Sequence, residues 1–252
     1  MASLPRIVVV GGHGKVALHF AHKASPYFSV TSLVRSESHF SEISQTGATP
    51  LLLSLEEASV DELAQTFKGC QGVLFAAGAG GKGGKDRTVK VDQQGAIKVF
   101  DAIERIEESA EGERKPKLIL VGALDTRDLN KPPPKHYNES DLEDSKKAHD
   151  AIGAYYDAKL AATRNLYSRT SFPWIELRPG HLKDSTPTGK VSLGVTHMGG
   201  VTREDVASVL VELFKQPRDA AKGLSLDLIQ GETEIEEAVK LAVQKNESSF
   251  TD

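Results

Sequence analysis

Short apolar runs alternate with longer amphipathic stretches along the whole chain. The first run is β-branched after its first residue, and a cluster of glycines follows it directly. Six further runs of similar length follow, and segments of helical composition separate them. The seven apolar runs are Arg6–Val10, Val30–Val34, Ala48–Leu53, Gly72–Ala77, Lys117–Val121, Trp174–Leu177 and Leu224–Ile229.

Continuous apolar strands that alternate with helices are typical of a parallel sheet covered on both faces. We therefore predict an α/β fold of the Rossmann type. It would be a doubly wound parallel sheet of about seven strands in a three-layer αβα arrangement, with right-handed crossovers. The predicted helices cover residues 14–23, 37–46, 59–68, 86–109, 150–170, 203–215 and 232–244.

Two regions interrupt this alternation. Residues 125–149 contain three consecutive prolines, Pro132–Pro134, and many charges, which predicts an exposed loop or a flap over a site. Residues 181–201 are rich in glycine and show little periodicity. Because the chain has no repeat and no evident linker, we interpret residues 1–252 as a single domain with these two loops on its substrate side.

Composition narrows the function classes. The 252 residues are 39% hydrophobic and 26% charged, which is ordinary globular usage. A formal charge of -4, with the basic residues dispersed, argues against nucleic acid as a partner. The one cysteine, Cys70, cannot form an internal disulfide, and the apolar run Ile7–Val10 is too short for a membrane span. We expect a cytoplasmic protein that binds no membrane and exists as a monomer or weak homodimer.

A glycine-rich turn links the first predicted strand to the first predicted helix. Gly11, Gly14 and Ala17 have the spacing that a dinucleotide-binding turn requires: a tight turn, close backbone approach to a pyrophosphate, and close packing of helix on strand. The helix N-terminus would present free N–H groups to the phosphates. The other interpretation is a turn that serves a different ligand. The residues assigned to the dinucleotide here are Gly11, Gly12, His13, Gly14, Lys15 and Val16.

The end of the second strand bears on which dinucleotide is bound. NAD-binding proteins commonly place an acidic residue there for the ribose hydroxyls. This chain has Arg35 and Ser36, and a guanidinium can pair bidentately with the 2′-phosphate of NADP. Glu37 could instead serve the ribose, and Arg35 could simply be a solvated strand end. We favour NADP(H), with NAD(H) as the alternative.

Tyr155 and Lys159 form a Y-x-x-x-K pair on the helix between the fifth and sixth strands. A spacing of four residues places both side chains on one face of the helix. An ammonium near a phenol allows the tyrosine to serve as a general acid or base, so we assign both residues as catalytic. An ordinary half-buried tyrosine beside a solvated lysine is the other interpretation.

The chain resembles the short-chain dehydrogenase/reductase superfamily in its atypical, NmrA-like branch, and most closely the small fungal NAD(P)-binding proteins of that branch. The resemblance covers nearly the whole chain. The motifs that carry it are the turn 11–17, Phe75-Ala76-Ala77-Gly78-Ala79-Gly80-Gly81, Val91-Asp92-Gln93-Gln94-Gly95, Tyr155 to Lys159, Leu177-Arg178-Pro179-Gly180, and Thr202-Arg203-Glu204-Asp205-Val206-Ala207.

The resemblance implies further cofactor contacts. Ala76, Ala77 and Gly78 would line the adenosine and pyrophosphate side, and Lys159 would hold the nicotinamide ribose. Pro179 and Gly180 would border the nicotinamide. We also assign Ser54, Leu55 and Val121 to the cofactor site.

Three positions depart from the family pattern. Members with a full catalytic triad carry a serine near the end of the fifth strand, where this chain reads Val121-Gly122-Ala123-Leu124, with no hydroxyl before Thr126. Ser54 stands where an acid often contacts adenine, and Asp92 stands where extended members carry an asparagine. The missing serine bears on carbonyl reduction, because loss of one oxyanion donor typically costs about 100- to 1000-fold in rate.

These observations favour an NADP(H)-dependent oxidoreductase that acts on an unknown small carbonyl, quinone or flavin-like substrate. The alternative is a non-catalytic NAD(P)H-sensing regulatory protein of the NmrA type, which the missing serine would suit. Lys82 and Lys85, in a glycine-rich stretch, could reach a phosphate or be solvated. His19 and His22 lack a third ligand, so we predict no metal site.

Overall fold

The computed structural model describes residues 3–80, 84–108 and 114–250. Seven strands of the main sheet are parallel to one another, in the order β10-β6-β5-β4-β1-β2-β3 with β3 at the edge, which confirms the predicted α/β class. They coincide with the seven predicted runs to within two residues at each end. Their bounds are β1 Arg6–Val10, β2 Ser29–Val34, β3 Thr49–Leu52, β4 Gly72–Phe75, β5 Lys117–Val121, β6 Trp174–Pro179 and β10 Leu224–Gln230.

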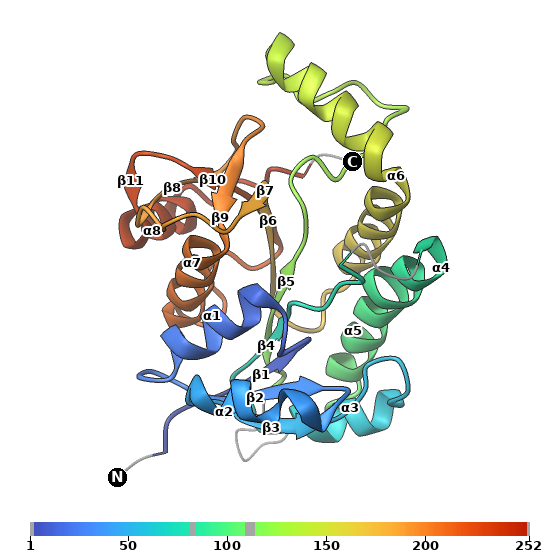
Figure 1. Cartoon of the computed structure of the whole chain (residues 1–252), viewed down its shortest axis with the longest axis vertical. Helices are drawn as coiled ribbons and strands as arrows, with labels where there is room; N and C mark the ends of the chain where they lie inside the picture. The colour runs from blue at the N-terminus through green and yellow to red at the C-terminus, as the bar shows by residue number, and fades with distance from the viewer. Residues whose placement is uncertain (1–2, 81–83, 109–113, 251–252) are drawn as a thin grey trace.

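Helices cover both faces of this sheet (Figure 1). Side chains of β1 alternate between the faces, so that Ile7 and Val9 join one core and Val8 and Val10 join the other. The helices are α1 Lys15–Ala24, η1 Glu37–His39, α2 Phe40–Gln45, α3 Val60–Phe67, α4 Gly84–Thr88, η2 Val89–Gly95, α5 Ala96–Glu104, α6 Glu139–Tyr167, α7 Arg203–Lys215 and α8 Ile235–Lys245.

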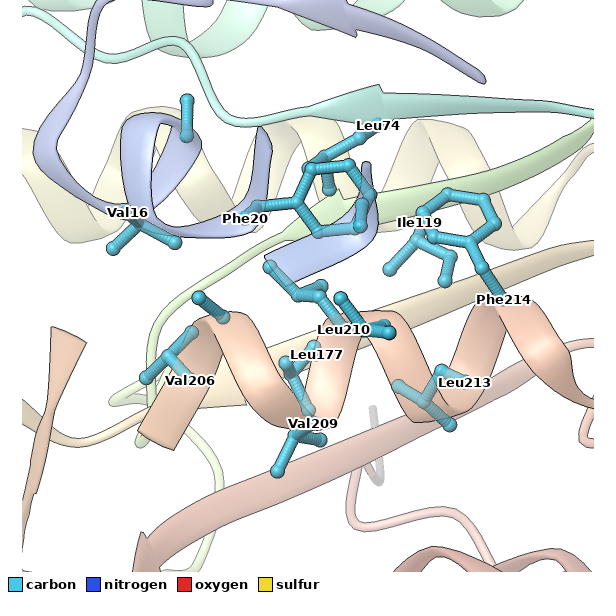
Figure 2. Close-up of a cluster of buried hydrophobic side chains, with 14 of the residues drawn as sticks. Val16, Phe20, Leu74, Ile119, Leu177, Val206, Val209, Leu210, Leu213 and Phe214 are labelled. Atoms are coloured by element: carbon cyan, nitrogen blue, oxygen red, sulfur yellow. The ribbon is translucent and has the colours of Figure 1, made fainter. Parts of the chain in front are cut away.

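The first core lies between the sheet and the neighbouring helices α1 and α7. Figure 2 shows Phe20 of α1 and Phe214 of α7 reaching toward each other beside Ile119 of β5. Their ring centroids are 5.7 Å apart, and both side chains are fully buried. This packing fixes the N-terminal end of α1, where the glycine turn lies. The second core is formed by α3, α5 and α6 on the opposite face.

The segment 125–149 is a loop only in its first half, so part of the loop prediction was wrong. Helix α6 begins at Glu139, because Asn138 and Asp141 form a reciprocal capping box at its N-terminus. The helix kinks at Ile152, whose φ of -135° and ψ of 37° are not helical. The half of α6 that precedes the kink, from Glu139 to Ile152, projects from the body of the protein (Figure 1).

The segment 181–201 contains strands that its irregular sequence did not predict. β7 His181–Lys183 and β9 Gly200–Thr202 pair with each other in a small parallel sheet. β8 Lys190–Gly194 joins β10 in antiparallel orientation, and β11 Thr233–Glu234 adds to β8, so the main sheet has nine strands in the described ranges. The predicted helix 86–109 is also divided, into α4, the π-helical η2 and α5.

The strand order reverses at β1, which β2 joins on one side and β4 on the other. A crevice opens at the carboxyl ends of parallel strands where such a reversal occurs, and this is where α/β proteins of this class bind ligands. Separately, the helices in the described ranges include none that is long and apolar enough to cross a membrane.

Candidate functional site

Two adjoining pockets run along the carboxyl ends of the strands and share Gly14 and residues 76–78. The first, here called the β2 pocket, has a volume of about 190 Å³ and lies beside the end of β2. The second, here called the β6 cleft, has a volume of about 1140 Å³ and extends past β5 and β6 to α6. The larger volume exceeds that of most single-ligand pockets, so it has room for part of a cofactor and a substrate together.

The glycine turn forms the junction of the two pockets. Gly11 has a φ of +82°, and a Cβ there would lie 2.6 Å from Cα of Ala77, so this position requires glycine. At Gly14 a Cβ would meet only backbone oxygens, at 3.3 Å or more, and the residue is exposed. Helix α1 starts at Lys15, so its free backbone N–H groups face this open space.

Most of the predicted cofactor residues lie along this pair of pockets, although their binding roles stay predictions. Gly12 and Ser36 have other contacts: Gly12 packs against Ser32 of β2, and the Ser36 hydroxyl accepts a hydrogen bond from the Ser38 N–H. Gly11, His13, Gly14, Arg35, Ser54, Leu55, Ala76, Ala77 and Gly78 line the β2 pocket. Lys15, Val16, Val121, Tyr155, Lys159, Pro179 and Gly180 line the β6 cleft.

Charged side chains gather in the β2 pocket. Glu56 lies between two guanidinium groups, 3.5 Å from Nη1 of Arg35 and 3.8 Å from Nη2 of Arg87. His13 stacks on His39, with ring centroids 3.7 Å apart. Sequence reasoning missed Glu56, Arg87 and His39. Glu56 lies two residues after Ser54 and His39 three residues after Ser36, so both are close in sequence to expected positions, whereas Arg87 is not.

Tyr155 and Lys159 face the β6 cleft together. Nζ of Lys159 lies 5.5 Å from the centroid of the Tyr155 ring, and it donates a hydrogen bond to the carbonyl of Val121 at 3.2 Å. The same ammonium lies 3.2 Å from Oδ1 of Asp92 on η2. Oδ2 of Asp92 accepts a hydrogen bond from the Ala79 N–H at 3.0 Å, so the carboxylate is held on both sides.

The surroundings of Tyr155 and Lys159 raise the pKa of both groups. Burial raises the pKa of the Tyr155 phenol, the charge of Lys159 opposes that effect, and Asp92 and Glu176 add to it. Burial also disfavours the ammonium of Lys159, but Tyr155 and Asp92 outweigh it and raise the pKa of Lys159. The arrangement can therefore supply a proton from Tyr155 and a fixed positive charge from Lys159.

Glu176 of β6 closes Gly122, one of the two positions, with Ala123, where the serine is expected. A Cβ at Gly122 would lie 2.6 Å from Oε1 of Glu176, which is fully buried and accepts hydrogen bonds from Thr163 and Ser225. The next hydroxyl along the chain, Thr126, is buried and donates to the carbonyl of Ala123. Neither segment offers a hydroxyl to a substrate in the cleft.

A second phenol, that of Tyr156, lines the cleft beside Tyr155. Its ring stacks on His149 at 4.0 Å between centroids, and Nε2 of His149 lies 3.1 Å from Oδ2 of Asp125. Burial, followed by the charge of Asp125, raises the pKa of Tyr156 to about 12. The Tyr156 ring is therefore held against a buried carboxylate–imidazole pair, and its phenol stays protonated at neutral pH.

The two segments predicted to flank the substrate both contribute walls to the β6 cleft. Asp144 and Lys147 lie on the projecting half of α6, and Met198 lies on the opposite wall. Asp141 joins the walls, because its carboxylate pairs with Nδ1 of His197 at 2.6 Å and accepts a hydrogen bond from the Met198 N–H at 2.8 Å. These contacts connect the N-terminal part of α6 to the segment 181–201 across the cleft.

Two further sequence predictions concern the lysines of the glycine-rich stretch and a metal site. Lys82, with Gly81 and Gly83, lies outside the described residues, and Lys85 does not line either pocket. Within the described ranges, no three His, Cys, Asp or Glu side chains are grouped so that they could hold a metal ion.

Comparison with known proteins shows which family model and which relatives this chain matches. Residues 11–217 match the family model described as NAD(P)H-binding. The chain is 39% identical over 249 residues to UPF0659 protein C216.03 of Schizosaccharomyces pombe, with 97% of each chain covered. It is 29% identical over 238 residues to the uncharacterized sugar epimerase YhfK of Bacillus subtilis, covering 93% of this chain and 99% of that one.

A solved structure shows the same architecture. A candidate NAD-dependent epimerase/dehydratase from Bacillus halodurans superposes with a TM-score of 0.74 at 28% sequence identity. The match covers 94% of this chain and 99% of that one. Together with the family model and the fungal relative, it confirms the resemblance read from the motifs.

Proposed function

Since the chain belongs to the NAD(P)H-binding family, we propose that it is an NADP(H)-dependent oxidoreductase of the atypical short-chain dehydrogenase/reductase type. One observation carries the proposal beyond binding: Tyr155 and Lys159 face the cleft that continues directly from the glycine turn. The substrate would be a small carbonyl, quinone or flavin-like molecule in the outer part of the β6 cleft, between α6 and Met198.

The order of the pockets supports one orientation of the cofactor. The β2 pocket, with Arg35, would take the adenosine end and its 2′-phosphate. The start of α1 at Lys15 would face the pyrophosphate, where the helix dipole favours negative charge. Lys159 would hold the ribose at the other end, and Pro179 would border the nicotinamide.

The residues of this chain would supply the proton of the reaction. The hydride would come from reduced nicotinamide when that cofactor is bound. Tyr155 would then donate its proton to the substrate atom that gains negative charge, and water would later return a proton to the phenolate. Lys159 would stabilise that phenolate while it exists. The negative charge of Asp92, which pairs with Lys159, weakens this stabilisation of the phenolate and raises the pKa of Tyr155. It therefore favours Tyr155 as a general acid rather than a general base.

The closed position at Gly122 bears on the substrate class. A carbonyl oxygen would lack the usual serine hydroxyl and would depend on Tyr155 and Tyr156 as hydrogen-bond donors. Quinone and flavin-like acceptors need less acid catalysis than an isolated ketone, because their rings delocalise the added charge. This supports acceptors of that kind as the first compounds to test.

The test is loss of nicotinamide absorbance when NADPH is mixed with quinones, flavins or aldehydes. With a carbonyl substrate, Tyr155→Phe should lower turnover by about 100-fold, within the usual range of general acid catalysis, and leave NADPH affinity nearly unchanged. Lys159→Ala should lower both. Tyr27→Phe, at a half-exposed tyrosine far from the cleft, is the matched control. Full activity in Tyr155→Phe would show that this residue is not the proton donor.

The second candidate is a non-catalytic protein that senses NAD(P)H. It is favoured by Glu176, whose carboxylate leaves no room for a side chain at Gly122, one of the two positions where the catalytic serine is expected. Tight NADPH binding with no oxidation by any acceptor would support it. Interconversion of a sugar without net change in nicotinamide absorbance would instead agree with the name of the Bacillus subtilis relative.

A further inference from the structure

Glu56 occupies the β2 pocket at the point where two guanidinium groups converge. The same oxygen, Oε1, faces Nη1 of Arg35 at 3.5 Å and Nη2 of Arg87 at 3.8 Å. The three residues come from different segments: the end of β2, the turn after β3, and α4. All three line the pocket, so the tertiary fold assembles a cation–anion–cation group there.

The two ion pairs are loose. Both distances are longer than the 2.7–2.9 Å of a strong charge-assisted hydrogen bond. The side chains of Arg35, Glu56 and Arg87 are 57%, 36% and 27% exposed, so water screens their attraction. An incoming anion with a higher charge and three oxygens could therefore replace the carboxylate between the guanidinium groups.

The backbone that carries Glu56 is firmly held. Nζ of Lys98 on α5 donates hydrogen bonds to the carbonyls of Leu55 at 2.9 Å and Ala58 at 2.8 Å. The turn after β3 is thereby tied to α5 on both sides of Glu56. Release of the carboxylate would require only a change of side-chain rotamer, while its backbone stays at the pocket wall.

We propose that Glu56 sets the choice between NADPH and NADH, by competing with the 2′-phosphate for Arg35 and Arg87 and by accepting the ribose hydroxyls of NADH. The inference rests on the proposed dinucleotide function and assigns the selectivity of that site to a carboxylate. With NADPH, the phosphate takes the place of Glu56 between the guanidinium groups. With NADH, Glu56 takes the ribose role that the sequence analysis considered for Glu37, which is exposed on η1.

The test is the pair of dissociation constants for NADPH and NADH in Glu56→Gln. Removing the competing charge should tighten NADPH by about threefold to tenfold and weaken NADH by a similar factor. Glu57→Gln removes the same charge from the exposed neighbouring residue, which does not line the pocket. An equal shift in Glu57→Gln, or an unchanged NADPH/NADH ratio in Glu56→Gln, would overturn the proposal.

The second guanidinium is tested by Arg87→Gln. NADPH should bind about tenfold more weakly, and NADH affinity should stay within about twofold, because only the phosphate uses this group. Lys90→Gln, which removes a positive charge from an exposed residue close in sequence, should leave both constants unchanged. A loss of NADH affinity equal to that of NADPH would show that Arg87 supports the pocket without reading the phosphate.

Two fragments separate this inference from the proposed function. Adenosine 2′,5′-bisphosphate and 5′-AMP differ in the 2′-phosphate and carry no nicotinamide. If Glu56→Gln shifts their relative affinity as it shifts NADPH and NADH, the selectivity role stands even when no substrate is turned over. If the wild-type protein binds neither the dinucleotides nor these fragments, both the inference and the proposed function fail.

Discussion

Nζ of Lys159 lies 3.2 Å from Oδ1 of Asp92, and both side chains are almost completely buried. The lysine that should assist Tyr155 therefore shares its charge with a carboxylate. An asparagine, which extended members of the superfamily carry at this position, would leave that charge uncompensated. The pair links η2 to α6 and determines how strongly Lys159 acts on the phenol.

Asp92→Asn should therefore lower the pKa of Tyr155, because it removes a negative charge near the phenol. Tyr155 donates a proton only while it is protonated, so activity is lost as the pH rises through its pKa. The alkaline limb of the pH–rate profile should move to lower pH by the same amount. Absorbance titration of the tyrosinate gives the shift without turnover. Asp86→Asn, at an exposed residue, is the control, and an equal shift there would contradict the pairing.

Gly14→Val should abolish dinucleotide binding and leave the fold intact. A Cβ at Gly14 would lie 3.3 Å from the carbonyl oxygen of Gly11, and the rest of a valine side chain would fill the place where a pyrophosphate approaches the N-terminus of α1. Calorimetric titration with NADPH measures the loss, and thermal unfolding checks the fold. His19→Val, which places a valine at an exposed position of the same helix, should bind normally. Unchanged affinity in Gly14→Val would remove this turn from the binding site.

Arg35→Ala should reduce an NADPH preference of about 30-fold to a few-fold and leave NADH affinity little changed. A preference of that size corresponds to about 2 kcal/mol and reflects charge-assisted bonds to the 2′-phosphate. Because Arg35 is more than half exposed, the preference should fall as salt is added. Dissociation constants for both dinucleotides at low and moderate salt are the measurement. Equal affinities in the wild-type protein would show that Arg35 only solvates the end of β2.

Lys117→Met should lower the free energy of unfolding by about 1–3 kcal/mol. The buried ammonium of Lys117 donates to the carbonyls of Leu213, Gln216 and Pro217 at the C-terminal end of α7, and methionine would leave them without that donor. Denaturant unfolding measures the change. Lys222→Met, at an exposed position, should have little effect. Equal stability of the two variants would mean that water replaces Lys117 at the helix end.

Most of the parallel strands could be predicted from the sequence because they are buried on both faces. Each such strand is a continuous apolar run, and a turn or helix separates it from the next. The edge of the sheet lacks this pattern. β8 is only partly buried and pairs in antiparallel orientation with β10, so its position depends on a partner distant in sequence. The start of α6 was missed because the proline run before Asn138 obscured the capping box.

The candidate site also combines features that the sequence predicts with features that depend on the tertiary structure. Its glycine turn and the Tyr155–Lys159 pair follow from local geometry, because Gly11 must adopt a positive φ and a spacing of four residues places two side chains on one helix face. The partners of these groups depend on where separate segments meet. Only the tertiary structure brings Glu56 between Arg35 and Arg87, places Asp92 against Lys159, and fills the space beside Gly122 with Glu176. The sequence by itself determined the fold class and the cofactor turn, because both follow from local patterns. Charges act through space over a few ångströms, whatever their separation along the chain. The electrostatics of the site were therefore decided by how the helices and loops pack.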